Sequence, residues 1–235
     1  AFDTETEGLN SLETEIVGIS FSWASNKGFY VPIKKDKSIQ LEYFNILKPF
    51  FNNKDIIKVG HNIKFDIKVL YKYDVVVSEP LYDTMVAHYL INPDMRHNLD
   101  TLSESYLNYT PISIESLIGK KGKNQKSMRD VSLEDITQYA AEDTDVTFQL
   151  FSILQKELQD KSLKSVFENI EVPLVSVLND MEHEGVCVDV PFLNAYSKEL
   201  QEQVLNAQNS IFESAGVEFN IASPQQVGKV LFEHL

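Results

Sequence analysis

The stretch Phe2-Asp3-Thr4-Glu5-Thr6 decides how the rest of this 235-residue sequence is organised. Its aromatic and β-branched residues favour a strand, and side chains two positions apart on a strand project from the same face. Asp3 and Glu5 therefore form a pair of neighbouring carboxylates. On a buried strand such a pair is unfavourable unless cations lie between the two groups. The pair alone also fits a solvated surface strand, so its meaning depends on which other carboxylates join it.

The composition predicts a globular protein with a sizeable core, because 43% of the residues are hydrophobic and 24% are charged. The single cysteine, Cys187, excludes an internal disulfide and a zinc site built from several cysteines, and it fits a reducing compartment. We expect its side chain to be buried. The sequence contains no signal peptide and no run of about 18 apolar residues, so we expect a cytoplasmic protein that does not engage a membrane.

The net charge of −14 argues against broad, non-specific adhesion to nucleic acid. It does not exclude an enzyme that acts on nucleic acid. A cluster of metal-binding carboxylates adds negative charge, and bound divalent cations reverse the local sign.

The first part of the sequence alternates between strand and helix patterns. The expected elements are strands at residues 2–6, 16–23 and 29–33, a helix at 41–51, a strand at 56–59 and a helix at 63–73. The turn residues 24–28 join the second and third strands into a hairpin. This order predicts the α/β class, with a mixed sheet flanked by helices.

Beyond residue 73 the patterns are mostly helical. Expected helices cover residues 82–91, 99–107, 132–159, 172–184, 192–215 and a last one from Ser223-Pro224, with a brief strand at 186–190. The character changes near residue 165, so we expect one domain over residues 1–165 and a helical segment over residues 166–235. Because both ends of the sequence fall inside expected elements, we also expect it to be a piece of a longer protein.

Two further segments place acidic side chains on expected helices. Asn62 and Asp66 are four residues apart, so they share a helix face that begins at the carboxyl end of a strand, the edge where open α/β sheets bind ligands. The alternative is a helix-capping asparagine followed by an exposed aspartate. Asp143 lies in the apolar stripe of the long helix, and Tyr139 is one turn earlier on the same side. The alternative for this pair is a core tyrosine bonded to a structural aspartate.

Together these residues supply the parts of a metal-dependent hydrolase. Four acidic side chains, Asp3, Glu5, Asp66 and Asp143, suffice for two divalent ions about 3.5–4 Å apart, which is the arrangement used for phosphodiester hydrolysis. Carboxylate oxygens select Mg²⁺ or Mn²⁺. A tyrosine with its usual pKa near 10 is a poor base, so we assign Tyr139 the orientation of the attacking water and assign activation of that water to metal.

These motifs resemble those of a known family. Phe2-Asp-Thr-Glu-Thr6, Asn62-x-x-x-Asp66 and Tyr139-x-x-x-Asp143 are similar to the three exonuclease motifs of the DEDD superfamily of 3′–5′ exonucleases, tyrosine subgroup. The closest resemblance is to the proofreading domain of bacterial DNA polymerase I (family A). The segments 171–186 and 219–226 resemble the start of the polymerase thumb in that family.

The resemblance implies a ribonuclease H-like exonuclease domain over residues 1–165, followed by the truncated N-terminal part of the polymerase region. It implies that Asp3, Glu5 and Asp143 hold one metal and that Asp3 and Asp66 hold a second, partly through water. It also implies a set of substrate contacts: Leu9 as a wedge against the terminal base, and Asn62, Arg96, Thr4, His61 and Phe65 near the terminal nucleotides. His61 and Phe65 stand where the best-known members carry glutamine and tyrosine.

The implied function is removal of nucleotides from a single-stranded or frayed 3′ end of DNA, in a bacterial, nucleoid-associated enzyme whose polymerase portion continues in cis. The polymerase catalytic motifs themselves are absent from these 235 residues. Two alternatives stay open: a ribonuclease D-like 3′–5′ exoribonuclease, and a catalytically inert domain that braces a polymerase.

Overall fold

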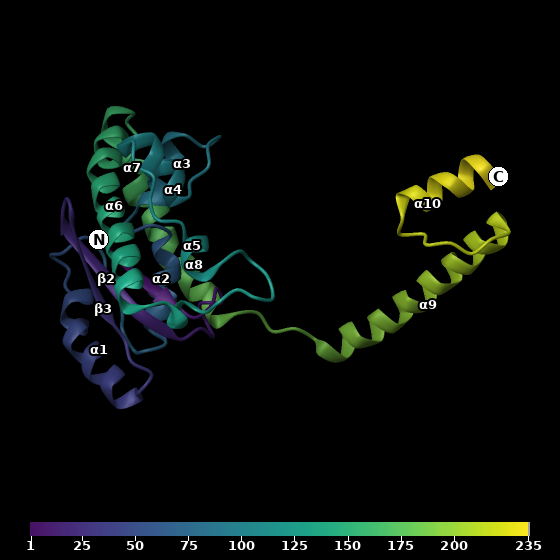
Figure 1. The fold of residues 1–235 in the computed structure, drawn as a ribbon, viewed down its shortest axis with the longest axis horizontal. Helices are drawn as coiled ribbons and strands as arrows, with labels where there is room; N and C mark the ends of the chain where they lie inside the picture. The colour runs from purple at the N-terminus through teal and green to yellow at the C-terminus, as the bar shows by residue number, and fades with distance from the viewer. Residues whose placement is uncertain (235) are drawn as a thin grey trace. The chain divides into compact units, whose positions relative to one another are not determined.

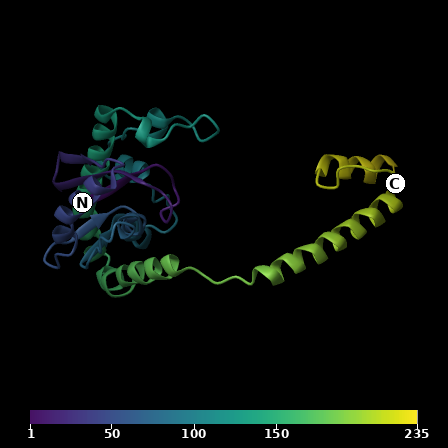
Figure 2. The same cartoon turned by 90° about the horizontal axis from the view of Figure 1, so that it is seen from below.

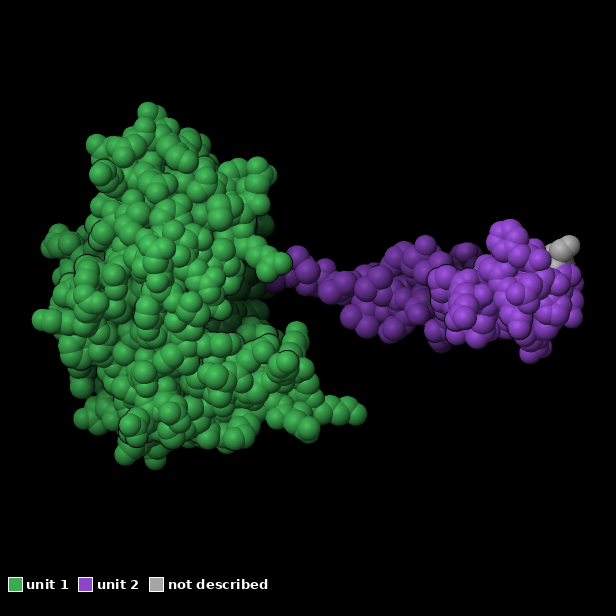
Figure 3. Space-filling model, turned by 45° about the horizontal axis from the view of Figure 1, so that its top comes forward, with its two compact units in different colours: residues 1–184 green, residues 185–235 purple. Residues whose placement is uncertain are grey.

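The computed structural model describes residues 1–234 and divides the chain into two compact units. Unit 1 is Ala1–Glu184, and unit 2 begins at Gly185. Figure 3 colours the two units separately. All the sequence-derived site residues belong to unit 1, and each unit is described by itself.

Unit 1 contains two short sheets (Figure 1). The strands β1 (Phe2–Thr6), β2 (Ile16–Ala24) and β3 (Lys27–Pro32) form an antiparallel sheet in that order. The strands β4 (Lys58–Gly60) and β5 (Leu81–Asp83) pair in parallel, and β4 contacts β1. Parallel and antiparallel pairing therefore both occur, which agrees with the mixed α/β arrangement expected from the sequence.

Helices cover both faces of these strands (Figures 1 and 2). The helical elements of unit 1 are α1 (Lys37–Phe51), α2 (Ile63–Tyr71), α3 (Thr84–Ile91), α4 (Leu99–Leu102), the π-helix η1 (Ser103–Leu107), α5 (Ile114–Ile118), the 3₁₀-helix η2 (Met128–Asp130), α6 (Leu133–Asp160), α7 (Lys164–Val166), the π-helix η3 (Phe167–Glu171) and α8 (Val172–Glu184). The long helix α6 contacts β1, β2, β3 and β4. In both views the loop between α5 and η2 extends from unit 1.

The alternation of side chains on β1 determines which residues face α6. Phe2 packs its ring edge-on against Phe51 of α1, with the ring centroids 5.1 Å apart. Because successive side chains on a strand point to opposite faces, Asp3 and Glu5 point away from α1 and toward α6. The apolar side of β1 thus fixes the strand in the core, and its acidic side is turned toward the helix that carries Tyr139 and Asp143.

Helix α6 approaches the sheet closely at one glycine. A Cβ atom at Gly28 on β3 would lie 2.1 Å from the backbone oxygen of Ala141. Ala141 is two residues from both Tyr139 and Asp143, so the absence of a side chain at Gly28 lets α6 bring these two residues toward the strands.

Unit 2 is helical. It contains α9 (Val190–Ala215), α10 (Pro224–Lys229) and the π-helix η4 (Val230–His234). The Asp189 side chain accepts a hydrogen bond from the Phe192 amide at 2.9 Å and so caps α9, while Gly216, with φ 68°, closes the helix in the left-handed conformation.

The structure differs from the expectations at several places. The first residues of the expected helix at 82–91 belong to β5, because Leu81 and Tyr82 are buried in register with Lys58 and Val59. No strand forms at residues 186–190 within the described chain, where the backbone has no partner strand. Cys187 is exposed rather than buried.

The compact unit also extends past residue 165. Phe167, Val172 and Val175 are buried in the same apolar core as Leu154 and Leu158, so the residues up to Glu184 pack with the first unit. Whether residues 166–235 form the start of a polymerase region stays a prediction. Among residues 1–234, no helix combines the length and the apolar character needed to cross a bilayer.

We expect the substitution Gly28→Ala to destabilise the protein by about 2 kcal/mol or more, because the added methyl group clashes with backbone rather than with a mobile side chain. The free energy of unfolding, measured by urea titration, tests this. Gly122→Ala is the matched control: a Cβ there meets nothing within 4 Å, so we expect a change of no more than about 0.5 kcal/mol. Equal effects of the two substitutions would contradict the close approach of α6 to β3.

Candidate active site

The acidic face of β1 forms one wall of a cavity of about 450 Å³. Asp3 and Glu5 line it together with Tyr139 and Asp143 of α6. Glu5 is only 6% exposed, and its Oε1 atom has no hydrogen-bond partner. Glu5 lies opposite Gly18 on β2, and the ring of Tyr30 occupies the space that a side chain at Gly18 would need. The cavity therefore brings together Glu5 and Asp143, which are 138 residues apart in the sequence.

The fourth carboxylate, Asp66, lies behind this wall rather than in it. Asp66 belongs to the first turn of α2 and is 1% exposed. Its Oδ1 atom accepts hydrogen bonds from the Thr4 amide at 2.9 Å and the Thr4 hydroxyl at 2.6 Å. Thr4 stands between Asp3 and Glu5 on β1, so these two bonds fix Asp66 next to the pair.

The start of α2 is not capped as a sequence pattern would suggest. Asn62 has a left-handed conformation with φ 62°, is exposed, and makes no side-chain capping bond. The Asp83 carboxylate instead accepts from the amides of Asn62 at 3.1 Å and Ile63 at 2.9 Å. It also accepts from the amides of Met85 at 2.8 Å and Val86 at 3.2 Å, which begin α3.

Asp83 is thus a buried residue that caps two helices at once, and sequence analysis missed its role. The segment Asp83-Thr84 does carry a local capping signal for α3, since aspartate is favoured before the first turn. Its second role depends on α2, whose capped amides are 20 and 21 residues away in the chain, and no local pattern reports that contact.

Tyr139 and Asp143 lie at the border of the buried stripe of α6. The buried residues of this helix are Ile136, Ala140, Thr144, Val146, Thr147, Leu150, Leu154 and Leu158. Asp143 and Tyr139 are partly buried, and both contribute to the cavity wall. The placement explains how a carboxylate is tolerated next to an apolar stripe: it faces a cavity.

Burial raises the pKa of all four carboxylates, and the charges of neighbouring carboxylates raise the pKa values of Glu5, Asp66 and Asp143 further. Burial raises the pKa of Asp3 from 3.8 to about 6. Burial, and then the charges of Asp3, Asp143 and Asp66, raise the pKa of Glu5 well above its usual range. The pKa of Asp66 is raised by burial and by Asp3. The pKa of Asp143 is raised by the same two causes and lowered by the neighbouring Tyr139 hydroxyl. Within residues 1–234, none of the salt bridges involves these four groups.

The donor set fits hard divalent cations. It consists of carboxylate oxygens alone, and one of them, Glu5 Oε1, is buried with no partner. Within the part of the chain that the structure describes, no three His, Cys, Asp or Glu side chains are already gathered at metal-binding spacing. Mutual repulsion opposes the close approach of these carboxylates, and a cation bound between them would offset it.

Four of the expected substrate contacts also line the cavity, and two do not. Leu9, Thr4, His61 and Phe65 contribute to its wall. Leu9 is 85% exposed, which is unusual for a leucine in a folded domain. The His61 Nδ1 atom is 2.9 Å from the Thr84 hydroxyl, and burial lowers the pKa of His61 to about 4, so the ring is neutral at pH 7. Asn62 and Arg96 are exposed and lie outside the cavity lining.

Comparison with known proteins identifies the family. A family model described as 3′–5′ exonuclease matches residues 1–159. The chain belongs to this exonuclease family. The match covers β1, α2 and α6, the elements that carry the carboxylates, so the family resemblance seen in the sequence is confirmed.

Two curated relatives are considerably longer than this chain. DNA polymerase I of Borreliella burgdorferi is 37% identical, and the alignment covers 100% of this chain and 26% of the relative. DNA polymerase I of Pseudomonas aeruginosa is 34% identical, and the alignment covers 100% of this chain and 27% of that relative. The chain thus spans about a quarter of the length of these relatives.

Solved structures show the same fold. The POL domain of Pol1 from M. smegmatis, in complex with DNA primer-template and dNTP, superposes with a TM-score of 0.74 at 21% identity and covers 100% of this chain and 37% of its own. Brucella melitensis NrnC with bound Mg²⁺ has a TM-score of 0.58 at 20% identity, covering 80% of this chain and 88% of its own. The expected ribonuclease H-like α/β fold, with helices around a mixed sheet and a helical C-terminal segment, is confirmed.

We expect the metal-free exonuclease domain to lose stability as the pH rises from about 4 to above 6. The folded state keeps Asp3 protonated up to a pKa of about 6, whereas the unfolded chain releases that proton near 3.8. The folded state therefore binds more protons in this window, and the free energy of unfolding falls with rising pH, by on the order of 1–3 kcal/mol.

Urea titrations in EDTA at pH 4.5, 5.5 and 7 measure this slope. The variant Asp3→Asn removes the titrating group, so its slope is expected to be smaller than that of the wild-type protein. A wild-type domain whose stability rises over this window, or an Asp3→Asn variant with an unchanged slope, would show that Asp3 is not held in a protonated state.

Proposed function

We propose that this chain is the 3′–5′ exonuclease portion of a bacterial DNA polymerase I and that it removes nucleotides from the 3′ end of DNA by metal-dependent hydrolysis. The observation that carries the proposal is the set of carboxylates, Asp3, Glu5 and Asp143, that line one cavity next to Tyr139 and form no salt bridge within residues 1–234. The match of the exonuclease family to residues 1–159 and the length of the DNA polymerase I relatives support it.

The proposed cofactors are two divalent cations, Mg²⁺ or Mn²⁺. Asp3, Glu5 and Asp143 would hold one ion, and Asp3 with Asp66 would hold the other, partly through water. When bound, the ions neutralise the carboxylates and stabilise negative charge on the attacking and leaving oxygens of the phosphodiester. The two bonds from Thr4 fix Asp66 to β1 beside Asp3 and Glu5, which supports this assignment.

Tyr139 is proposed to orient the attacking water rather than to deprotonate it. Burial and the charges of Asp143 and Glu5 raise the pKa of Tyr139 above its usual range. The hydroxyl therefore keeps its proton at any physiological pH and acts as a hydrogen-bond donor. Its place on the same cavity wall as Asp143 puts that donor beside the acidic groups.

The substrate contacts are proposed from the family resemblance and the cavity lining. Leu9 would press against the terminal base, and Thr4, His61 and Phe65 would contact the terminal nucleotide within the cavity. Asn62 and Arg96, which lie outside the lining, would contact the terminal nucleotide and its phosphates from beside the cavity.

The biological setting follows from the relatives. We propose proofreading of DNA synthesis in the bacterial cytoplasm, close to the nucleoid, with the polymerase portion of the protein continuing in cis from residues 166–235. Unit 2 supports this assignment: α9 exposes many apolar side chains that further protein would cover, among them Phe192, Leu193 and Val204.

Digestion of a single-stranded DNA oligonucleotide with a 3′ label tests the function. We expect release of 3′ mononucleotides with Mg²⁺, none with EDTA, and a loss of at least about 10³-fold in Asp3→Ala, since metal binding contributes several kcal/mol to such reactions. The exposed Asp55 lies away from the cavity, so Asp55→Ala is the matched control and is expected to keep wild-type activity.

The same assay separates the alternatives. Activity that survives Asp3→Ala would contradict the metal site. A wild-type protein without Mg²⁺-dependent activity would favour an inert domain that braces the polymerase. Faster digestion of RNA than of DNA of the same sequence would favour a ribonuclease D-like enzyme.

A further inference from the structure

The loop between β1 and β2 forms one side of the cavity mouth. We call residues 7–15 the Leu9 loop. Its first residues, Glu7, Gly8 and Leu9, line the cavity, and the Leu9 side chain is 85% exposed. Burial therefore does not fix Leu9, so any defined position must come from the polar contacts of the loop that carries it.

Hydrogen bonds within the Leu9 loop close it into a compact turn. The Glu7 amide donates to the Glu15 carbonyl at 3.0 Å, and the Gly8 amide donates to the Thr14 hydroxyl at 2.8 Å. The amide of Thr14 donates to the carbonyl of Asn10 at 2.8 Å. These bonds join the two sides of the loop, so its ends are held to each other.

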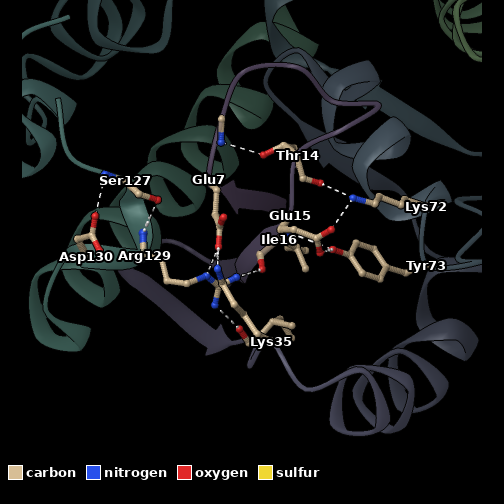
Figure 4. Close-up of polar contacts among 12 residues, drawn as sticks. Glu7, Thr14, Glu15, Ile16, Lys35, Lys72, Tyr73, Ser127, Arg129 and Asp130 are labelled. Carbon is tan, nitrogen blue, oxygen red and sulfur yellow. Dashed lines mark hydrogen bonds and ion pairs between the residues drawn. The ribbon is translucent and has the colours of Figure 1, made fainter. Parts of the chain in front are cut away.

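A first set of contacts anchors the outgoing end of the loop to α2 and the residues after it (Figure 4). The Lys72 ammonium donates to the carbonyls of Glu13 at 3.1 Å and Thr14 at 3.0 Å and to the Glu15 carboxylate at 2.8 Å. The Tyr73 hydroxyl donates to the same carboxylate at 3.0 Å. This end of the loop is therefore fixed to the two residues that directly follow α2, the helix that carries Asp66.

Arg129 anchors the incoming end (Figure 4). Its Nε atom donates to the Glu7 carboxylate, Nη1 donates to the Ile33 carbonyl at 3.1 Å, and Nη2 donates to the Ile16 carbonyl at 2.6 Å. The Arg129 side chain is 22% exposed, whereas Lys35, the second cation on Glu7, is 64% exposed. A partly buried, multidentate guanidinium holds its partners more firmly than an exposed ammonium does.

Arg129 belongs to the opposite side of the cavity mouth. It is in η2, whose first residue, Met128, is buried. Gln125, Lys126 and Met128 line the cavity. The turn itself is fixed by a capping box between Ser127 and Asp130. The guanidinium thus connects one side of the mouth, η2, to the other side, the Leu9 loop, and bonds to the ends of β2 and β3 as well.

We propose that Arg129 is a positioning residue that holds the Leu9 loop against η2 and so determines how well the cavity accepts a 3′-terminal nucleotide, above all one that must be separated from a paired strand. Arg129 touches none of the four carboxylates and lies outside the cavity lining, so its effect is on binding and not on hydrolysis. The proposal rests on the proposed exonuclease function.

Steady-state kinetics on two DNA substrates test the proposal: a single strand, and the same strand with its 3′ end paired. For Arg129→Ala we expect a KM on the single strand raised about tenfold with kcat changed less than about twofold, and a lower ratio of paired-end to single-strand rate. Arg129→Lys keeps the charge but cannot make all three hydrogen bonds, so its KM should lie between those of the wild type and Arg129→Ala. Lys164→Ala, which breaks an exposed ion pair with Glu168, is the control and should match the wild type.

Hydrogen exchange in the metal-free protein gives a second readout that needs no activity. We expect the Glu7 and Gly8 amides to exchange about tenfold faster in Arg129→Ala, with the amides of α8 unchanged. Glu7→Gln weakens the same contact from the loop side and leaves η2 intact, so it should reproduce the exchange and KM changes even where Arg129→Ala fails to fold.

The outcomes separate this proposal from the proposed function. Unchanged exchange and unchanged KM in Arg129→Ala and Glu7→Gln would overturn it, as would a loss confined to kcat. If the wild-type domain lacks exonuclease activity but both variants still speed exchange of the Glu7 and Gly8 amides, the proposed exonuclease function is wrong. The role of Arg129 in holding the Leu9 loop is then still supported.

Discussion

The repulsion among four carboxylates is the constraint on which the rest of the structure depends. Asp3, Glu5, Asp66 and Asp143 come from a strand and two helices, and no lysine or arginine forms a salt bridge with them within residues 1–234. Groups that repel one another do not assemble by themselves, so the surrounding fold has to hold them. It does so through apolar packing on the reverse face of β1, where Phe2 meets Phe51, and through specific contacts at each helix.

Each of those contacts has a distinct physical basis. One backbone amide and one hydroxyl, both from Thr4, hold Asp66. The Asp83 carboxylate fixes the start of α2 by taking up amides that would otherwise be unsatisfied. The missing side chain at Gly28 allows α6 to lie close to the sheet. Around the mouth of the cavity, Arg129 and Lys72 hold the Leu9 loop at its two ends. The site is thus assembled by contacts between segments that are far apart in the sequence.

That origin explains which features were predictable from the sequence. The pairing of Asp3 with Glu5 and of Tyr139 with Asp143 follows from strand and helix periodicity, and the order of elements gave the α/β class. The strand Leu81–Asp83 is too short to show a period, and the capping of α2 by Asp83 is invisible to a local pattern. The contacts of Arg129 with Glu7 and Ile16 span more than a hundred residues, and nothing in the sequence around Arg129 indicates them.

The two-metal site is tested most directly in crystals soaked with Mn²⁺ and a nucleoside monophosphate. Anomalous diffraction from these crystals gives the number and position of the bound Mn²⁺ ions. We expect two ions about 4 Å apart, one contacted by Asp3, Glu5 and Asp143 and the other by Asp3 and Asp66. Crystals in which these carboxylates bind no Mn²⁺, or only a single ion, would contradict this expectation.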